Sequence, residues 1–111
     1  MVYKKDINKL FRELRKAGFY AKQDYWCCQS CGWADVPAGT QKVVFYHNQD
    51  TERAFGGTHY LVDGLMLAWG GQASTKVIVR ELSKTIINCG LKFSWDGSED
   101  SRFEILPEKD D

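Results

Sequence analysis

The apolar positions near the start of the chain repeat with the period of an α-helix. Four of them share one helical face through the spacing i, i+3, i+4, i+7, namely Ile7, Leu10, Phe11 and Leu14. Asp6 is placed to cap this helix, and Gly18 lies just beyond its end. The pattern predicts an amphipathic helix whose apolar stripe faces the protein core.

A second helical pattern begins after Gly70-Gly71, where Ser74 is the predicted N-cap. Its apolar face carries Ile78, Leu82, Ile86 and Cys89. Gly90 ends the segment. Cys89 is therefore predicted to be a small core residue and not a ligand.

A strand and a short helix are predicted in the middle of the chain. Residues 42–47 are β-branched and aromatic, which is typical of a strand, and His47 sits at its end. Residues 48–55 form the predicted helix, with Asp50 as its cap. Gly56-Gly57 ends it.

Two further pairs of strand patterns surround turn residues. Residues 60–62 and 65–69 flank Asp63-Gly64, a strong signal for a two-residue hairpin. Residues 91–95 and 103–105 alternate apolar and polar positions on either side of a turn at 96–98, which predicts a second hairpin.

These elements predict the α+β class, with two main helices packed on one face of a largely antiparallel sheet of about five strands. The predicted single domain covers residues 1–106, and residues 107–111 are expected to form an acidic tail.

Composition is that of an ordinary globular domain. The chain has 111 residues, of which 43% are hydrophobic and 27% are charged. Its longest apolar run, 65–69, is far shorter than the roughly 18 residues that cross a bilayer, so no membrane span is expected. The first residues lack the apolar segment of a secretory signal. We therefore expect a cytoplasmic protein whose thiols stay reduced.

The formal net charge is +0, but the charge is unevenly spread. A basic ribbon lies opposite the apolar stripe of the first predicted helix and comprises Lys5, Lys9, Arg12 and Lys16. The C-terminal residues are acidic. The ribbon makes a nucleic-acid-binding module one hypothesis. Because the whole chain is neutral, we expect a solvated face instead, and nucleic acid is not the expected partner.

The segment 26–33 contains three of the four cysteines and two of the four tryptophans. Cys28 and Cys31 have the spacing of a metal knuckle, which predicts zinc bound to their thiolates. His47 is the candidate third ligand, with Cys27 or His59 as the fourth. Neighbouring residues in extended backbone point to opposite sides, so Cys27 and Cys28 are not expected to share an ion without a kink. The alternative is a set of reduced thiols packed among aromatic side chains.

Two catalytic interpretations compete with the zinc site. The string Trp-Cys-x-x-Cys is typical of dithiol redox proteins, but the extra Cys27 breaks the spacing, and Gly32 stands where a helix should begin. Cys31, His47 and Asp50 form a possible nucleophile, base and orienting group for a thiol hydrolase or transferase.

Aromatic and polar residues suggest a further pocket for a flat ligand such as a base or nucleotide. The binding candidates are Trp33, Tyr46, Gln49, Asp50, Arg53, Trp69 and Trp95. The competing interpretation is that the aromatic residues only build the core of a small domain.

Four motifs give the chain a resemblance to a known family. They are CCxxCG at 27–32, FYHxQD at 45–50, AWGG at 68–71 and WDGS at 95–98. In this order they resemble a family of small bacterial proteins known only as a domain of unknown function. The resemblance implies no activity, ligand or metal. It singles out Cys27, Cys28, Cys31, His47, Gln49 and Asp50, and it lends no support to His59.

Our leading hypothesis is a small, non-enzymatic binding or interaction protein, such as a phage-borne inhibitor or sequestering protein, whose Cys/His cluster holds zinc. Its partner is an unidentified protein or small ligand. The thiol hydrolase or transferase and the nucleic-acid-binding module are the alternatives.

Overall fold

A five-stranded sheet runs through the protein. The computed structural model describes residues 1–109. The strands are β1 (Tyr20–Lys22), β2 (Val43–Phe45), β3 (Leu65–Gly70), β4 (Leu91–Ser94) and β5 (Phe103–Lys109). Their order in the sheet is β1-β2-β3-β5-β4. β1 pairs with β2 in parallel and every other pairing is antiparallel, so the predicted α+β class and the largely antiparallel sheet are confirmed.

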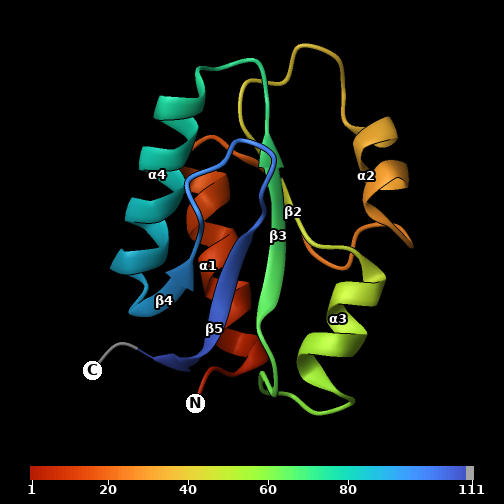
Figure 1. Cartoon of the computed structure of the whole chain (residues 1–111), viewed down its shortest axis with the longest axis vertical. Coiled ribbons are helices and arrows are strands. Elements are labelled where there is room, and N and C mark those ends of the chain that lie inside the picture. The colour runs from red at the N-terminus through yellow and green to blue at the C-terminus, as the bar shows by residue number, and fades with distance from the viewer. Residues whose placement is uncertain (110–111) are drawn as a thin grey trace.

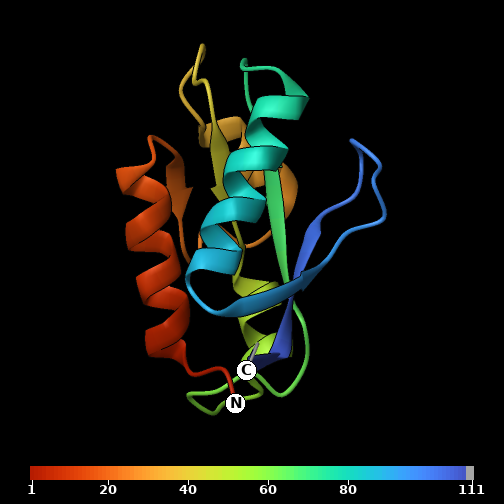
Figure 2. The ribbon, with the colours of Figure 1, turned by 90° about the vertical axis from the view of Figure 1, so that its left-hand side faces the viewer.

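Four helices flank this sheet: α1 (Lys4–Lys16), α2 (Gln29–Asp35), α3 (Asn48–Phe55) and α4 (Thr75–Asn88). α1 and α4 lie on one side of the strands, whereas α2 and α3 lie on the other (Figure 1). Figure 2 shows α1 and α4 side by side in front of the sheet. The prediction of two main helices on one face is correct for α1 and α4 but incomplete, because both faces are covered. None of the helices in residues 1–109 has the length and apolar character to span a bilayer.

The alternation along β3 divides the core into two layers. Leu65, Leu67 and Trp69 belong to the large cluster that includes the buried residues of α1 and α4. Ala68 belongs to a smaller cluster on the opposite face, together with Val43 and Phe45. Successive side chains of a strand point to opposite faces, so a sheet covered on both sides needs apolar residues at consecutive positions.

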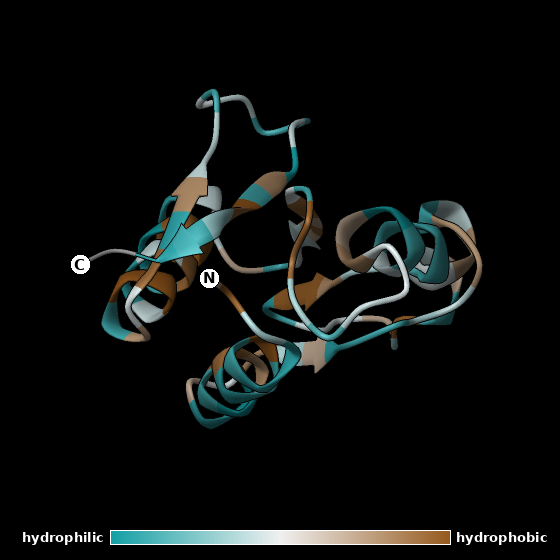
Figure 3. Ribbon diagram, turned by 90° about the horizontal axis from the view of Figure 1, so that it is seen from below, coloured by the Kyte–Doolittle hydropathy of each residue, from teal (hydrophilic) through white to brown (hydrophobic). Residues whose placement is uncertain are grey.

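The caps of two helices differ from the prediction. α1 begins after Tyr3, and the Asp6 carboxylate accepts a hydrogen bond from the Tyr3 backbone N–H at 2.8 Å, so Asp6 is the acidic partner of a capping box and not the N-cap. α3 begins after His47, and Asp50 occupies the equivalent third position. The N-cap of α4 is Ser74, as predicted. The hydrophilic face of α1 points away from the strands (Figure 3), which agrees with an exposed basic ribbon.

The predicted hairpin at Asp63-Gly64 is wrong. Residue Tyr60 forms an isolated bridge with Tyr3, and the N–H of Leu61 donates to the carbonyl of Val2 at 2.8 Å. The N–H of Val62 donates to the carbonyl of Ala54 at 2.7 Å. Residues 60–62 are therefore bound to the N-terminus and to the end of α3, and β3 pairs instead with β2 and β5.

The hairpin of β4 and β5 is confirmed, but β5 is longer than predicted. Phe93 is paired with Ile105, and the strand continues into the segment expected to be an acidic tail. The Val2 N–H donates to the Pro107 carbonyl at 3.2 Å, and Lys109 Nζ lies 3.1 Å from an Asp6 oxygen. Residues 110 and 111 of the predicted tail lie outside the described residues.

Helix α2 packs on the sheet through a residue without a side chain. A Cβ atom added to Gly32 would lie 2.6 Å from Cε2 and 2.8 Å from Cζ of the Phe45 ring. The Phe45 ring is fully buried, and the Trp33 ring packs edge-on against it with centroids 5.2 Å apart. This close approach sets the distance between α2 and β2. It therefore also sets the position of the cysteine segment relative to the sheet.

Replacing Gly32 by alanine should therefore destabilise the protein by about 1–2 kcal/mol, because overpacking against Phe45 outweighs the gain in helix propensity. Urea denaturation measures the change in the free energy of unfolding. Gln29→Ala, at an exposed position of the same helix, is the control and should shift this free energy by less than about 0.5 kcal/mol. A Gly32→Ala protein as stable as the parent would show that α2 does not depend on this contact.

Candidate functional site

The segment that precedes the cysteines is bound to the junction of β2 and α3. The N–H of Tyr25 donates to the Tyr46 carbonyl at 2.8 Å, and the N–H of Asn48 donates to the Trp26 carbonyl at 2.9 Å. The Asp24 carboxylate accepts a hydrogen bond from the Thr51 hydroxyl at 2.9 Å. Asp24 and Trp26 both have left-handed backbone conformations, with φ of 53° and 63°. Such values are uncommon for residues other than glycine and are unusual for a bulky one.

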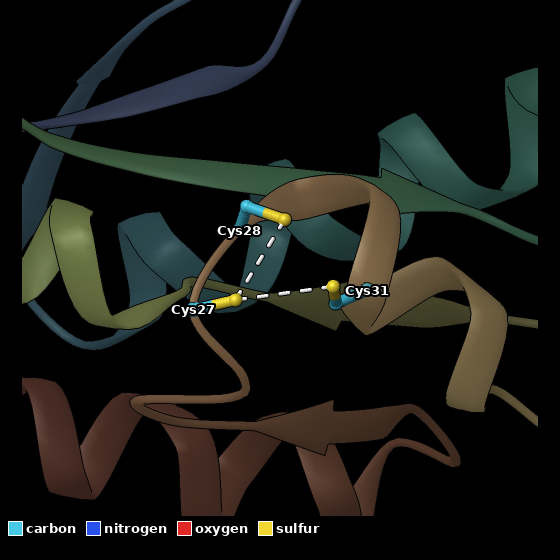
Figure 4. Close-up of side chains that lie close together, drawn as sticks. All are labelled: Cys27, Cys28 and Cys31. Atoms are coloured by element: carbon cyan, nitrogen blue, oxygen red, sulfur yellow. Dashed lines mark hydrogen bonds between the residues drawn. The ribbon is translucent and has the colours of Figure 1, made fainter.

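Three sulfur atoms converge immediately after this turn (Figure 4). The Sγ of Cys27 lies 3.9 Å from that of Cys28 and 3.8 Å from that of Cys31. All three sulfurs lie within 4.8 Å of one another, and all three cysteines are free thiols. This cluster of Cys27, Cys28 and Cys31, here called the thiol cluster, could hold a metal ion.

Cys27 and Cys28 do not lie in straight extended backbone, because the chain bends at Trp26, Cys27 and Cys28. This bend is the kink that the two sulfurs need in order to lie on the same side. Cys28 is the extended N-cap of α2, and Cys31 lies in the first turn of that helix. The helix thus begins at Gln29, inside the CxxC motif, and Gly32 is a helical residue. The expectation that Gly32 speaks against a helix at this point is therefore wrong.

The thiols of the cluster differ in acidity. The pKa of Cys28 is lowered to about 7, first by the neighbouring Cys31 backbone N–H and then by the Ser30 hydroxyl. The Cys28 side chain makes no regular capping hydrogen bond to α2. The pKa of Cys31 is raised to about 11, first by its hydrogen bond to Cys28 and then by Cys27. Cys28 therefore carries the thiolate near neutral pH, and Cys31 stays protonated.

Cys28 should accordingly react with iodoacetamide in a pH-dependent manner with a midpoint near pH 7, below the value of about 8.5 for an ordinary thiol. The rate should rise as pH increases through this midpoint, because only the thiolate attacks. Peptide mass spectrometry after timed alkylation assigns the rate to each cysteine. Cys89 is the internal control, since burial raises its pKa. Equal rates for Cys28 and Cys89 at pH 7 would contradict this assignment.

His47 serves a different role from the predicted one. Its Nδ1 accepts a hydrogen bond from the Asp50 N–H at 3.2 Å, and its Nε2 lies 3.2 Å from Asp50 Oδ2. Both ring nitrogens are thus engaged by Asp50. Among residues 1–109, no histidine or carboxylate atom joins the three sulfurs within 4.8 Å of all of them. His59 contributes its carbonyl to the start of α1, where it accepts from the Lys4 N–H at 2.8 Å.

Arg102 completes a buried polar network that the sequence analysis missed. Its Nη1 lies 3.2 and 3.4 Å from the two carboxylate oxygens of Asp50. Asp50 is 5% and His47 8% exposed. The contact joins residues 52 positions apart, and no local pattern marks it. The network of His47, Asp50 and Arg102 fastens the start of α3 to the chain just before β5.

Replacing Asp50 by alanine removes the acceptor of both partners and should lower the free energy of unfolding by about 2–3 kcal/mol, because the buried His47 and the partly buried Arg102 lose their partner. Thermal and urea denaturation measure this loss. Glu52→Ala, on the exposed face of the same helix, should change the stability by less than about 0.5 kcal/mol. If both variants were equally stable, the network would not contribute to the stability of the fold.

The other binding candidates are spread over several environments. Tyr46 is fully buried and edge-on to Phe11 at 5.4 Å, and Trp95 stacks on Phe103 at 5.1 Å. These two rings belong to the packing of the large core. The structure places Gln49 and Arg53 at exposed positions of α3. It does not gather the seven candidates into one pocket.

Trp33 and Trp69 do meet at a small cavity of about 200 Å³, which Arg102 also lines. Gln29, at the start of α2, lies on the same cavity wall. Two acidic residues, Glu99 and Asp100, line it as well. The cavity thus carries both signs of charge and does not define one ligand class.

Fold and site together define a small α+β protein with an exposed cluster of three reduced thiols. The sequence profile of the domain of unknown function DUF6891 matches residues 5–109, and the chain belongs to this family. The family resemblance stated from the motifs is thereby confirmed. No curated protein and no solved structure gives a significant match to the chain.

Proposed function

We propose that this protein is a small, non-enzymatic metal-binding protein in which Cys27, Cys28 and Cys31 hold a zinc ion. The observation that carries the proposal is the spacing of the three sulfurs. Tetrahedral zinc binds thiolates at about 2.3 Å, so two sulfurs on one ion lie roughly 3.8 Å apart. The Sγ of Cys27 lies 3.9 Å from that of Cys28 and 3.8 Å from that of Cys31, in agreement with this value, and the Cys28 and Cys31 sulfurs lie within 4.8 Å of each other.

The chemistry of the donor set also favours zinc. Thiolates select zinc, monovalent copper and other soft ions over magnesium or calcium. Cys28 supplies a thiolate near neutral pH. The other two thiols must lose protons on binding, so the affinity should increase with pH. In the cytoplasm, where we place the protein, thiols stay reduced and available to a metal.

Three protein thiolates leave one coordination position for another group. Cys27 and Cys31 are exposed, so a water molecule or a donor atom from a partner has access to the ion. An open position of this kind supports a sequestering or inhibitory role, in which the ion joins the protein to a small ligand or to another protein. His47 is not needed as a ligand in this arrangement, which separates the proposal from the cluster predicted from the sequence.

The alternative thiol hydrolase or transferase receives less support from the geometry. Its nucleophile, Cys31, has a raised pKa, and both ring nitrogens of its proposed base, His47, are engaged by Asp50. An activated nucleophile needs a base within hydrogen-bond reach. The geometry therefore favours binding over hydrolysis.

Native mass spectrometry tests the proposal. Protein purified under reducing conditions, stripped with a chelator and given excess zinc should gain one zinc ion. Replacing Cys27, Cys28 and Cys31 together by serine should abolish this gain, whereas Cys89→Ser should retain it, because Cys89 lies outside the thiol cluster. Absence of zinc in the parent protein would contradict the proposal, and so would loss of zinc in the Cys89→Ser variant.

A further inference from the structure

We propose that the metal-free thiol cluster also performs thiol–disulfide exchange with a low-molecular-weight disulfide, with Cys28 as the attacking thiol and Cys31 as the resolving thiol. This activity goes beyond zinc binding and does not depend on it. It requires two thiols that are close enough to form a disulfide. One of them must attack the external disulfide first, and the other must attack the resulting mixed disulfide afterwards. The thiol cluster provides both conditions.

The first condition is proximity. Cys28 stands at the N-cap of α2, and Cys31 follows in the first turn, with the two sulfurs within 4.8 Å of each other. A disulfide bond is about 2.05 Å long, so the sulfurs must approach by less than 3 Å, which side-chain rotation can supply. Both belong to the short, exposed start of one helix.

The reaction balances without any metal or cofactor. The Cys28 thiolate attacks one sulfur of the external disulfide, forms a mixed disulfide and expels one thiolate. Cys31 then attacks Cys28 Sγ, forms the intramolecular disulfide and expels the second thiolate. The protein loses two electrons and two protons, and the external disulfide is reduced to two thiols.

The second condition is the order of the two attacks, and the surroundings of the sulfurs set it. The Ser30 hydroxyl lies 3.6 Å from Cys28 Sγ, where it can donate a hydrogen bond to a thiolate on that atom. This contact favours Cys28 as the thiol that attacks first. Once Cys28 is part of a mixed disulfide, Cys31 is the remaining thiol of the CxxC motif and can attack it.

Cys27 is the competing resolving thiol, since its sulfur lies 3.9 Å from that of Cys28. A bond between these two would close the small ring of a vicinal disulfide, which departs from relaxed disulfide geometry. Cys31 closes a longer loop without that strain. We therefore assign the resolving step to Cys31.

A shallow depression beside Cys31 offers space for the group attached to Cys28. It is lined by Trp26, Cys31, Ala34 and Asp35 and has a volume of about 270 Å³. Trp26 is 52% exposed, although its backbone carbonyl is held by the hydrogen bond from the Asn48 N–H. An exposed indole at this position provides an apolar surface against which the substituent of the mixed disulfide can rest.

The test uses chelator-treated, reduced full-length protein and oxidised glutathione as the probe, followed by acid quenching and mass spectrometry of the intact protein and its peptides. The parent protein should end as the Cys28–Cys31 disulfide without retained glutathione. Cys31→Ser keeps the backbone N–H beside Cys28 and should accumulate the glutathione adduct on Cys28. Cys28→Ser, which places a favourable N-cap residue at the start of α2, should lose the attacking thiol and consume oxidised glutathione more slowly than the parent protein.

Cys27→Ser and Cys89→Ser are the matched controls, and both should still form the Cys28–Cys31 disulfide. Closure of a disulfide in Cys31→Ser would overturn the assignment of the resolving thiol. Stable glutathione adducts on the parent protein, or modification of Cys89 before Cys28, would overturn the exchange activity. Zinc binding by the same preparations is measured separately, so exchange without zinc binding refutes only the metal site, and zinc binding without exchange refutes only this inference.

Discussion

The backbone hydrogen bond from the Asn48 N–H to the Trp26 carbonyl is the constraint on which the site depends. Together with the bond from Tyr25 to Tyr46, it holds the turn before the cysteines against the junction of β2 and α3. The turn can meet both bonds because Trp26 adopts a left-handed conformation, with φ of 63°. An extended chain would send the first two sulfurs to opposite sides, whereas the bend that continues from Trp26 through Cys27 and Cys28 brings them together.

The donor of that hydrogen bond, Asn48, is the first residue of α3, so the bond depends on the stability of the start of α3. The His47, Asp50 and Arg102 network closes the first turn of α3 and joins it to the residue before β5. A second attachment comes from Gly32, which lets α2 approach the Phe45 ring. The thiol cluster is therefore positioned from both ends, by α3 before Cys27 and by α2 after Cys28. Because the three thiols are already held close together, little conformational entropy is lost when they bind the same ion.

The parts of the fold that the sequence predicted are those with a strong local period. α1 and α4 each repeat apolar residues every three or four positions, and the hairpin of β4 and β5 alternates clearly. α2 was not predicted from the sequence, because a helix of 7 residues that contains Gly32 has no repeating apolar face. The hairpin predicted at Asp63-Gly64 failed because residues 60–62 pair with the N-terminus, a contact that turn chemistry cannot reveal.

The sequence predicted that cysteines form the candidate site, but it did not predict which of the candidate ligands lie together. The CxxC spacing correctly identified Cys28 and Cys31 as neighbours in space. Of the two further ligands predicted, Cys27 lies in the thiol cluster and His47 does not. The sequence does not reveal this difference, because the bend at Trp26 and the contact of Asp50 with Arg102 both arise from tertiary structure. Position alone made His47 a metal-ligand candidate, while its actual partner lies three residues further along the chain.

X-ray absorption spectroscopy of the zinc-loaded protein tests the convergence of the three sulfurs most directly, because it counts the atoms bound to the ion. We expect three sulfur neighbours at about 2.3 Å and one nitrogen or oxygen neighbour. Two or fewer sulfurs around the ion, or coordination by the imidazole of His47, would show that the three cysteines do not form the metal site.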